Sequence, residues 1–170
     1  KGTDVSRFFP DVVRNVLTTH FELKRLVYMF LAHYVDKDDE TRTAALMAIN
    51  SFQKELQDPN EVVRALALRT LTSFRVDDVR QIQIMAVSAC SRDSSEYVRK
   101  VAAIAVTKLP RAKALEDEVV GPLLRDSSAS VMGSAAAAML EVCPDRLDLV
   151  HPAFRRICAS LGQMDEWGQV

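Results

Sequence analysis

One phrase occurs three times along this chain of 170 residues. The copies "DPNEVVRALALRTL", "DSSEYVRKVAAIAV" and "DSSASVMGSAAAAM" begin at Asp58, Asp93 and Asp126, so they lie 35 and 33 residues apart. A period of this length is typical of helical-repeat proteins. In each copy, apolar residues stand 5, 9 and 13 residues after the Asp, and a spacing of four puts them on one stripe of one helix.

We predict that this stripe faces the core, with a small Ala at its middle that lets a neighbouring helix approach closely. A helix pair of this kind cannot bury its apolar faces alone, so successive pairs stack on one another. A weaker copy begins at Thr18 and has Lys24 where the others have Arg or Met. The predicted core positions of the three clear copies are Val63, Ala67, Val98, Ala102, Val131 and Ala135.

Helical periodicity covers nearly the whole chain, and no useful stretch alternates with a period of two. Asp or Ser precedes several of the predicted helices, as N-caps require; these caps are Ser94 or Ser95, Ser127 or Ser128, and Asp145. The predicted helices span 9–20, 21–35, 41–56, 60–74, 78–91, 95–109, 114–125, 128–142 and 146–161. The fold class is therefore all-α, with about four helix pairs and one extra helix in a single segment over 1–170.

Composition excludes several classes of function. The formal net charge of -1 gives no overall field that would attract nucleic acid. No apolar run approaches the roughly 20 residues of a membrane-spanning helix. The three cysteines lie far apart, which favours buried thiols in a reducing, cytoplasmic compartment. Because the chain starts without Met or a signal-like segment, we expect an internal fragment of a longer protein.

Residues with the spacing of an active site or a metal site are missing from the sequence. His20, His33 and His151 share no ligand spacing, and the acidic run at 36–40 lacks the Gly and distal Glu of a calcium loop. We predict no catalytic, metal-binding or cofactor-binding residues. Basic residues at helix ends leave open contact with an acidic partner or a phosphoinositide headgroup; they are Arg75, Arg80, Arg111, Lys113, Arg155 and Arg156.

The pattern D-x4-V-R-x-x-A resembles the HEAT repeat, in which Asp and Arg side chains form a ladder between neighbouring repeats. Asp58, Arg64, Asp93 and Arg99 match it. The resemblance implies a right-handed helical solenoid of the HEAT or armadillo type, and it implies that Arg99 lies near Asp58 or Asp93. Met132 replaces the third Arg, so we predict that the ladder stops there and that the last repeats stack through apolar contacts alone.

Longer phrases resemble the trunk of the β-adaptins, the large β subunits of heterotetrameric adaptor complexes that build vesicle coats. The phrases are "LKRLVYMFLAHY" (23–34), "AINSFQKELQDPNEVVRALALRTL" (48–71), "EYVRKVAAIAVTKL" (96–109) and "EWGQV" (166–170). The segment "EVCPDRLDLVHPAFRRIC" (141–158) is most similar to the β subunit of the third adaptor complex. Since the fragment would be interior, we expect Trp167 to be partly uncovered.

The β-adaptin resemblance implies a non-catalytic scaffold for cargo sorting and protein transport at endosome and trans-Golgi membranes. Its implied partners are the N-terminal domain of the medium chain, the second large chain and, for some members, a small Arf-type GTPase. The chain would be cytoplasmic and peripheral on vesicle membranes, with no nucleic-acid partner. The alternative is another helical-repeat scaffold, either a nuclear transport receptor or a phosphatase scaffold.

Overall fold

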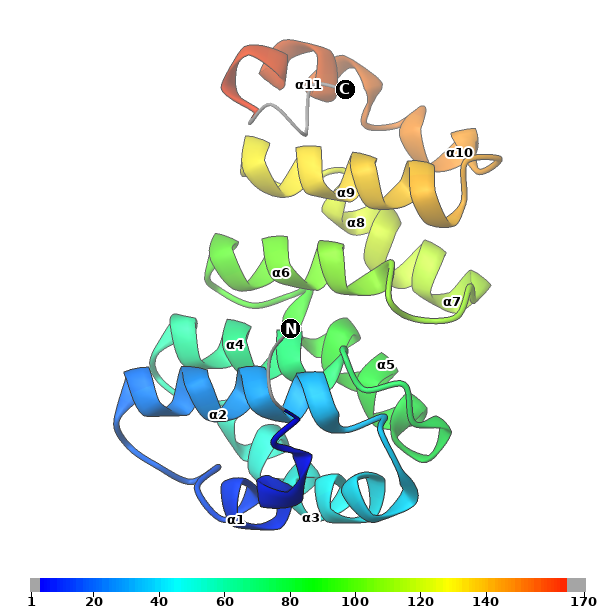
Figure 1. The fold of residues 1–170 in the computed structure, drawn as a ribbon. Coiled ribbons are helices and arrows are strands. Elements are labelled where there is room, and N and C mark those ends of the chain that lie inside the picture. Colours follow the sequence, from blue (N-terminus) through cyan, green and yellow to red (C-terminus); the bar gives the residue numbers. More distant parts are fainter. Residues whose placement is uncertain (1–3, 165–170) are drawn as a thin grey trace. The chain divides into compact units, whose positions relative to one another are not determined.

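The computed structural model describes residues 4–164, and these residues form helices and turns without any strand (Figure 1). The chain divides into two compact units, Lys1–Gln83 and Ile84–Val170. The all-α prediction is confirmed. Trp167 lies outside the described residues.

The first unit contains two helix pairs. The long helices begin at identifiable caps: Asp38 accepts a hydrogen bond from the backbone N–H of Thr41 at 2.8 Å, and Asn60 accepts one from Val62 at 2.9 Å. The hydroxyl oxygen of Thr41 accepts a hydrogen bond from the backbone N–H of Asp38, which completes a capping box. The elements are η1 (Ser6–Phe8), α1 (Phe9–Val13), α2 (Phe21–Tyr34), α3 (Asp39–Glu55), α4 (Glu61–Leu71), η2 (Asp77–Val79) and the start of α5 (Arg80–Cys90).

Aromatic side chains form the centre of this first core. The rings of Tyr28 and Phe52 meet edge to face with centroids 4.9 Å apart, and Phe52 meets Phe74 in the same way at 5.6 Å. Leu31 and Leu68 are fully buried beside them on α2 and α4, which pack against each other. Edge-to-face pairs at these distances stabilise a core beyond the area they bury.

The second unit is built around two adjacent helices, α6 and α9, which run side by side in Figure 1. Their stripes are made of small residues, so the two backbones approach closely. After the end of α5, the elements are α6 (Glu96–Val106), α7 (Lys113–Leu115), the π-helix η3 (Glu116–Val120), α8 (Gly121–Leu123), α9 (Ala129–Val142), α10 (Leu147–Val150), α11 (Phe154–Ser160) and η4 (Leu161–Gln163).

All six predicted core residues are buried. Val63 is the most exposed of them at 8%, whereas Ala67, Val98, Ala102 and Val131 are fully covered. The weaker upstream copy differs at its first stripe position, because Leu23 is 44% exposed and the neighbouring Lys24 is buried instead. The four-residue spacing thus identifies the inward face in the three clear copies.

Two predicted helices are interrupted by turns. The helix predicted over 9–20 ends at Val13, and the side-chain amide of Asn15 donates to the carbonyl of Asp11 at 2.9 Å. A side chain that bonds the local backbone in this way competes with continuation of the helix. The predicted 146–161 helix is broken between α10 and α11 around Pro152, which has no N–H to donate. Asp145 is not its cap, because Arg146 occupies the N-cap position of α10.

The predicted 114–125 helix is irregular for a related reason. Its middle is the π-helix η3, which stands immediately before Gly121 and Pro122. Pro122 cannot donate a hydrogen bond one turn back, and the wider π turn accommodates it. The described residues therefore contain the four expected pairs, and the extra helix is divided into α10 and α11.

Close packing of α6 against α9 predicts the effect of enlarging a side chain between them. Ala102→Leu is expected to lower the free energy of unfolding by about 1–3 kcal/mol through overpacking. Ala137→Leu on the exposed face of α9 is the matched control and should change it by less than about 0.5 kcal/mol. Urea denaturation measures both. Equal stability of the two variants would contradict this assignment of the buried face.

Candidate functional site

The Asp that opens each repeated phrase shapes the turn before the helix. The carboxylates of Asp58, Asp93 and Asp126 each accept a hydrogen bond at 2.8 Å from the backbone N–H two residues further on. This is an Asx turn, and it holds the N-cap residue in place. Ser95 and Ser128 occupy the predicted N-cap positions, but their hydroxyls make no capping bond. The Asp therefore supplies the side-chain contact that the Ser does not.

The Arg six residues after the Asp closes the same turn from the helix side. Nη1 of Arg64 donates to the carbonyls of Asp58 at 2.8 Å and Pro59 at 3.1 Å. Nη1 of Arg99 donates in the same way to Asp93 at 2.9 Å and Ser94 at 3.0 Å. Both Arg residues of the predicted ladder thus bind the turn of their own repeat.

Arg99 also reaches the next repeat of the second unit. Its Nε and Nη2 donate to the two carboxylate oxygens of Asp126 at 2.7 and 2.9 Å, with side chains 15% and 9% exposed. Burial opposes ionisation of Asp126, but the bonds from Arg99 and from the Ser128 N–H hold the pKa of this carboxyl below its usual value. A paired, bidentate Arg–carboxylate contact is among the strongest polar contacts in proteins.

The carboxylate that Arg99 binds is therefore one repeat further along the chain than the sequence indicated. The expectation that Arg99 lies near Asp93 is confirmed by the bond to the Asp93 backbone carbonyl, but the carboxylate that binds Arg99 on two sides is that of Asp126. Sequence spacing does not specify in which direction along a stack a side chain reaches. Asp126 stands at the first position of the third phrase, so the repeat itself was the signal that could have identified it.

Met132, which takes the place of the third Arg, is 1% exposed and packs in the core. The prediction that the last repeats stack through apolar contacts alone is wrong. Glu116 on η3, with its side chain 4% exposed, accepts from Nε of Arg111 at 2.8 Å and from Nη1 of Arg146 at 2.7 Å. This contact joins the π-helix to the turn before α10. The sequence pattern indicated only that Arg111 lies near a helix end, and it gave no sign that Arg111 and Arg146 share the Glu116 carboxylate.

In the first unit, Lys24 occupies the Arg position of the weak copy and binds Glu55 at the end of α3. Both side chains are 9% exposed. Burial is the main influence on Glu55, and the nearby Asp58 charge adds to it, so the pKa of Glu55 is raised despite the bond from Lys24. Oε2 of Glu55 is buried without a hydrogen-bond partner. An ion pair thus links successive helix pairs here as well, with a different pair of residues.

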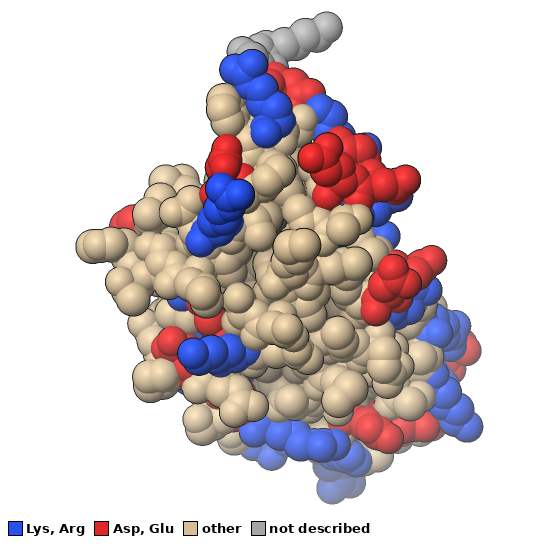
Figure 2. Space-filling view, turned by 90° about the horizontal axis from the view of Figure 1, so that it is seen from below, with Lys and Arg blue, Asp and Glu red and all other residues tan. Residues whose placement is uncertain are grey.

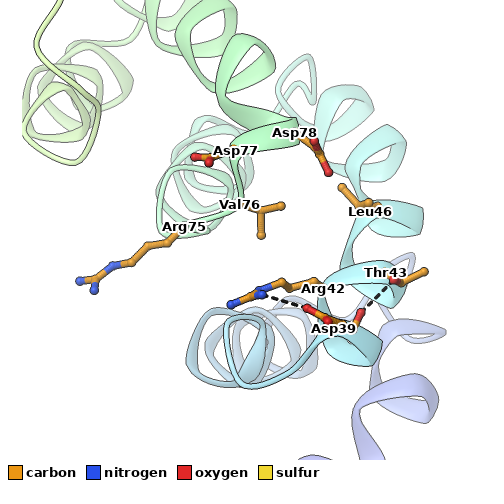
Figure 3. Close-up of a pocket in the computed structure, with 8 residues that line it drawn as sticks. All are labelled: Asp39, Arg42, Thr43, Leu46, Arg75, Val76, Asp77 and Asp78. Atoms are coloured by element: carbon orange, nitrogen blue, oxygen red, sulfur yellow. Dashed lines mark hydrogen bonds and ion pairs between the residues drawn. The ribbon is translucent and has the colours of Figure 1, made fainter.

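The acidic run at 36–40 lies beside a hollow of about 480 Å³ in the first unit (Figure 3). Asp39 accepts from Arg42 at 3.0 Å, whereas the side chain of Arg75 points away from the hollow. Asp36 accepts the backbone N–H of Arg75 at 3.2 Å. Asp39 thus pairs with a guanidinium, Asp36 accepts from the backbone, and Asp38 caps α3. Among the described residues, no three His, Cys, Asp or Glu side chains gather as metal ligands.

Charges of both signs are interspersed on the face over α1 and α3, where uncharged side chains fill the middle (Figure 2). This face presents no continuous basic stripe of the kind that nucleic acid requires. None of the helices in 4–164 has the length and hydropathy needed to cross a bilayer.

Comparison with known proteins gives a consistent result. The family described as "Adaptin N terminal region" matches residues 1–170. The chain is 45% identical over 174 aligned residues to the AP-3 complex subunit beta-1 of Homo sapiens, covering 100% of this chain and 16% of that protein. The AP-3 complex subunit beta of Dictyostelium discoideum is 42% identical with 100% and 15% coverage, and the AP-1 complex subunit beta-1 of Mus musculus is 37% identical with 99% and 19% coverage.

The fold is also similar to that of a known assembly. The match is to a homology model of the full-length AP-3 complex in an intermediate open conformation, with a TM-score of 0.68 and 33% identity. It covers 98% of this chain and 27% of that one. The chain therefore spans less than a third of the proteins that it matches.

The Arg99 contacts predict a loss of stability when the guanidinium is removed. Arg99→Ala should lower the free energy of unfolding by about 1.5–3 kcal/mol, because the poorly accessible carboxylate of Asp126 would lose its charged hydrogen-bond donor. The exposed neighbour Arg92 provides the control, and Arg92→Ala should cost less than about 0.5 kcal/mol. Denaturant unfolding of both variants tests this prediction. If Arg99→Ala leaves the free energy of unfolding unchanged, the ladder contact does not stabilise the fold.

The raised pKa of Glu55 predicts a pH dependence of stability. The folded state holds the Glu55 proton more tightly than the unfolded state, so this contribution is complete at low pH and is lost as pH rises through the folded pKa. The stability of wild type relative to Glu55→Gln should therefore fall with rising pH. The stability of wild type relative to Asp126→Asn should instead rise with pH, since the pKa of Asp126 is lowered in the folded state. Parallel pH curves for wild type and Glu55→Gln would contradict the assignment.

Proposed function

The chain belongs to the adaptin N-terminal region family, and we propose that it is a non-catalytic scaffold segment of a vesicle-coat adaptor complex. The full-chain similarity to AP-3 and AP-1 β subunits supports this proposal. Its role is to hold partner subunits in position for cargo sorting and intracellular protein transport. Residues 1–170 form one stretch of the helical trunk.

The observation that carries the proposal is the way in which polar contacts fix successive repeats. The Arg99–Asp126 pair is bidentate and nearly covered, so it sets both the spacing and the angle between its two repeats. A scaffold requires this rigidity, because a partner that spans several repeats recognises their relative orientation.

The proposed partners are the other subunits of the complex. The medium chain, through its N-terminal domain, and the second large chain are the primary ones. A small Arf-type GTPase is a further proposed partner on the membrane. Localisation is proposed to be cytoplasmic and peripheral, on endosome and trans-Golgi-derived vesicles on the route to lysosomes. Identity to AP-3 β subunits, at 45% and 42%, supports that complex over AP-1 at 37%.

A nuclear transport receptor or a phosphatase scaffold would use the same kind of repeat. Similarity to adaptor β subunits over the whole chain favours the adaptor. Affinity purification of the full-length protein from cytosol distinguishes these functions. Medium, small and second large adaptor subunits are expected in the bound fraction, whereas phosphatase subunits or nuclear transport cargo in their place would overturn the proposal.

Assembly should depend on the ladder more than on overall stability. At a temperature where the variant remains folded, Arg99→Ala is expected to weaken co-purification with the medium chain about tenfold, which corresponds to roughly 1.4 kcal/mol. The reason is that the angle between repeats is no longer fixed. Arg92→Ala is the control and should assemble as wild type does. If the folded Arg99→Ala protein assembles normally, the Arg99–Asp126 pair is not needed for the scaffold function.

A further inference from the structure

A buried ion pair connects α2 to α3 in the first unit. Lys24 on α2 donates to Oε1 of Glu55 at the end of α3, and both side chains are largely covered. This cover comes from residues within the unit, so further repeats of a longer protein can add to it but cannot remove it. The burial of the pair therefore does not depend on how much of the protein surrounds the unit.

The surroundings of this pair leave polar atoms without partners. Oε2 of Glu55 is buried without a hydrogen-bond partner among the described residues, and so is the hydroxyl of Tyr28, one helical turn after Lys24. Burial raises the pKa of Glu55 although the bond from Lys24 acts in the opposite direction. Loss of solvation thus outweighs the attraction to Lys24. A buried pair of this kind does not stabilise a fold relative to well-packed apolar side chains.

The helix that carries Lys24 has two apolar faces. The face packed into the unit consists of four buried residues, Lys24, Val27, Tyr28 and Leu31. A helix turns about 100° per residue, so a second set points in roughly the opposite direction; it consists of Leu23, Leu26, Met29 and Phe30. Apart from Glu22 and His33 at the two ends of the helix, this second face is apolar. Hydrophobic burial alone would therefore favour the face without Lys24.

Packing of the second face against α3 would separate the two charges. Lys24 would turn away from α3, and Glu55 would remain inside without its charged donor. An unpaired charge inside a protein is strongly destabilising. The edge-to-face contact between Tyr28 and Phe52 would also be lost. The alternative packing is thus opposed by the pair, although its apolar contacts would be at least as favourable.

We propose that the Lys24–Glu55 pair selects which face of α2 packs against α3 and α4. The pair destabilises the opposite packing more than it stabilises the observed one. It thereby fixes how the first helix pair is oriented on the second within this unit. This selection is a conformational device of the fold, and it does not rest on the proposed scaffold function.

Two measurements on the full-length protein test the selection. Hydrogen exchange with mass spectrometry reports the stability of α2 through its backbone amides. A 4-fluorophenylalanine in place of Phe52 reports its surroundings by fluorine NMR, because the ring of Phe52 contacts those of Tyr28 and Phe74. The number of fluorine resonances gives the number of slowly exchanging arrangements around this ring.

The variants remove the charges one at a time and then together. They are Lys24→Met, Glu55→Met and the double variant Lys24→Met/Glu55→Met, in which the flexible Met side chains fill the space without charge. The matched control is Asp39→Met/Arg42→Met, which removes an ion pair from the surface of α3, where the Asp39 side chain is 96% exposed and that of Arg42 is 45% exposed.

Each single variant should exchange the α2 amides faster than wild type by about tenfold or more, because one buried charge is left without its partner. The double variant should exchange them no faster than wild type, yet give more than one fluorine resonance. Wild type and the control should each give a single resonance. This combination, undiminished protection with several arrangements, is the signature of a pair that selects a packing without stabilising it.

Two results would overturn the proposal. If the double variant fails to fold, or exchanges its α2 amides faster than wild type, the pair stabilises the observed packing directly. If the double variant gives a single fluorine resonance, apolar contacts alone select the face of α2 and the pair is not needed for it. Because the double variant decides both points, the proposal remains testable even where a single variant does not fold.

Discussion

The carboxylate of Asp126 makes two contacts on which the arrangement of the second unit depends. It accepts the backbone N–H of Ser128, which fixes the turn into α9, and it accepts the guanidinium of Arg99 from the preceding repeat. One side chain therefore defines where a helix begins and where its neighbour lies. Since both contacts are nearly covered from solvent, they are screened weakly by salt.

Different charged side chains link one helix pair to the next in the part of the chain that the structure describes. Arg99 and Asp126 use a bidentate pair across two turns. Lys24 and Glu55 use a buried pair at the end of α3, at the cost of a carboxylate oxygen without a partner. Where Met132 replaces the Arg, the polar link moves to Glu116 and its two Arg partners. Each link contains at least one buried charged side chain, and leaving such a charge unpaired inside a protein is costly.

These links suit the proposed role as a scaffold that presents surfaces to partner subunits. The described residues are helical, and the whole chain is similar in sequence to AP-3 β subunits. Its apolar stripes hold the helices together within each unit. Because the hydrophobic effect is non-directional, small shifts of one helix against another change this contribution little. Polar links are less tolerant, because hydrogen bonds require defined distances and angles. The proposed scaffold depends on the defined geometry that these polar links require.

Local sequence patterns were enough to predict the all-α class and the inward faces of the three clear repeats. Val98, Ala102, Val131 and Ala135 are buried because their four-residue spacing leaves one apolar stripe, and the opening Asp sets each turn through contacts two residues away. Such local relations are legible along a chain. The partners of the long charged side chains became visible in the folded chain: Arg99 binds Asp126, Lys24 pairs with Glu55, and Arg146 reaches the buried Glu116. These contacts join residues about 30 apart, and sequence spacing does not specify which of several acceptors a long side chain will meet.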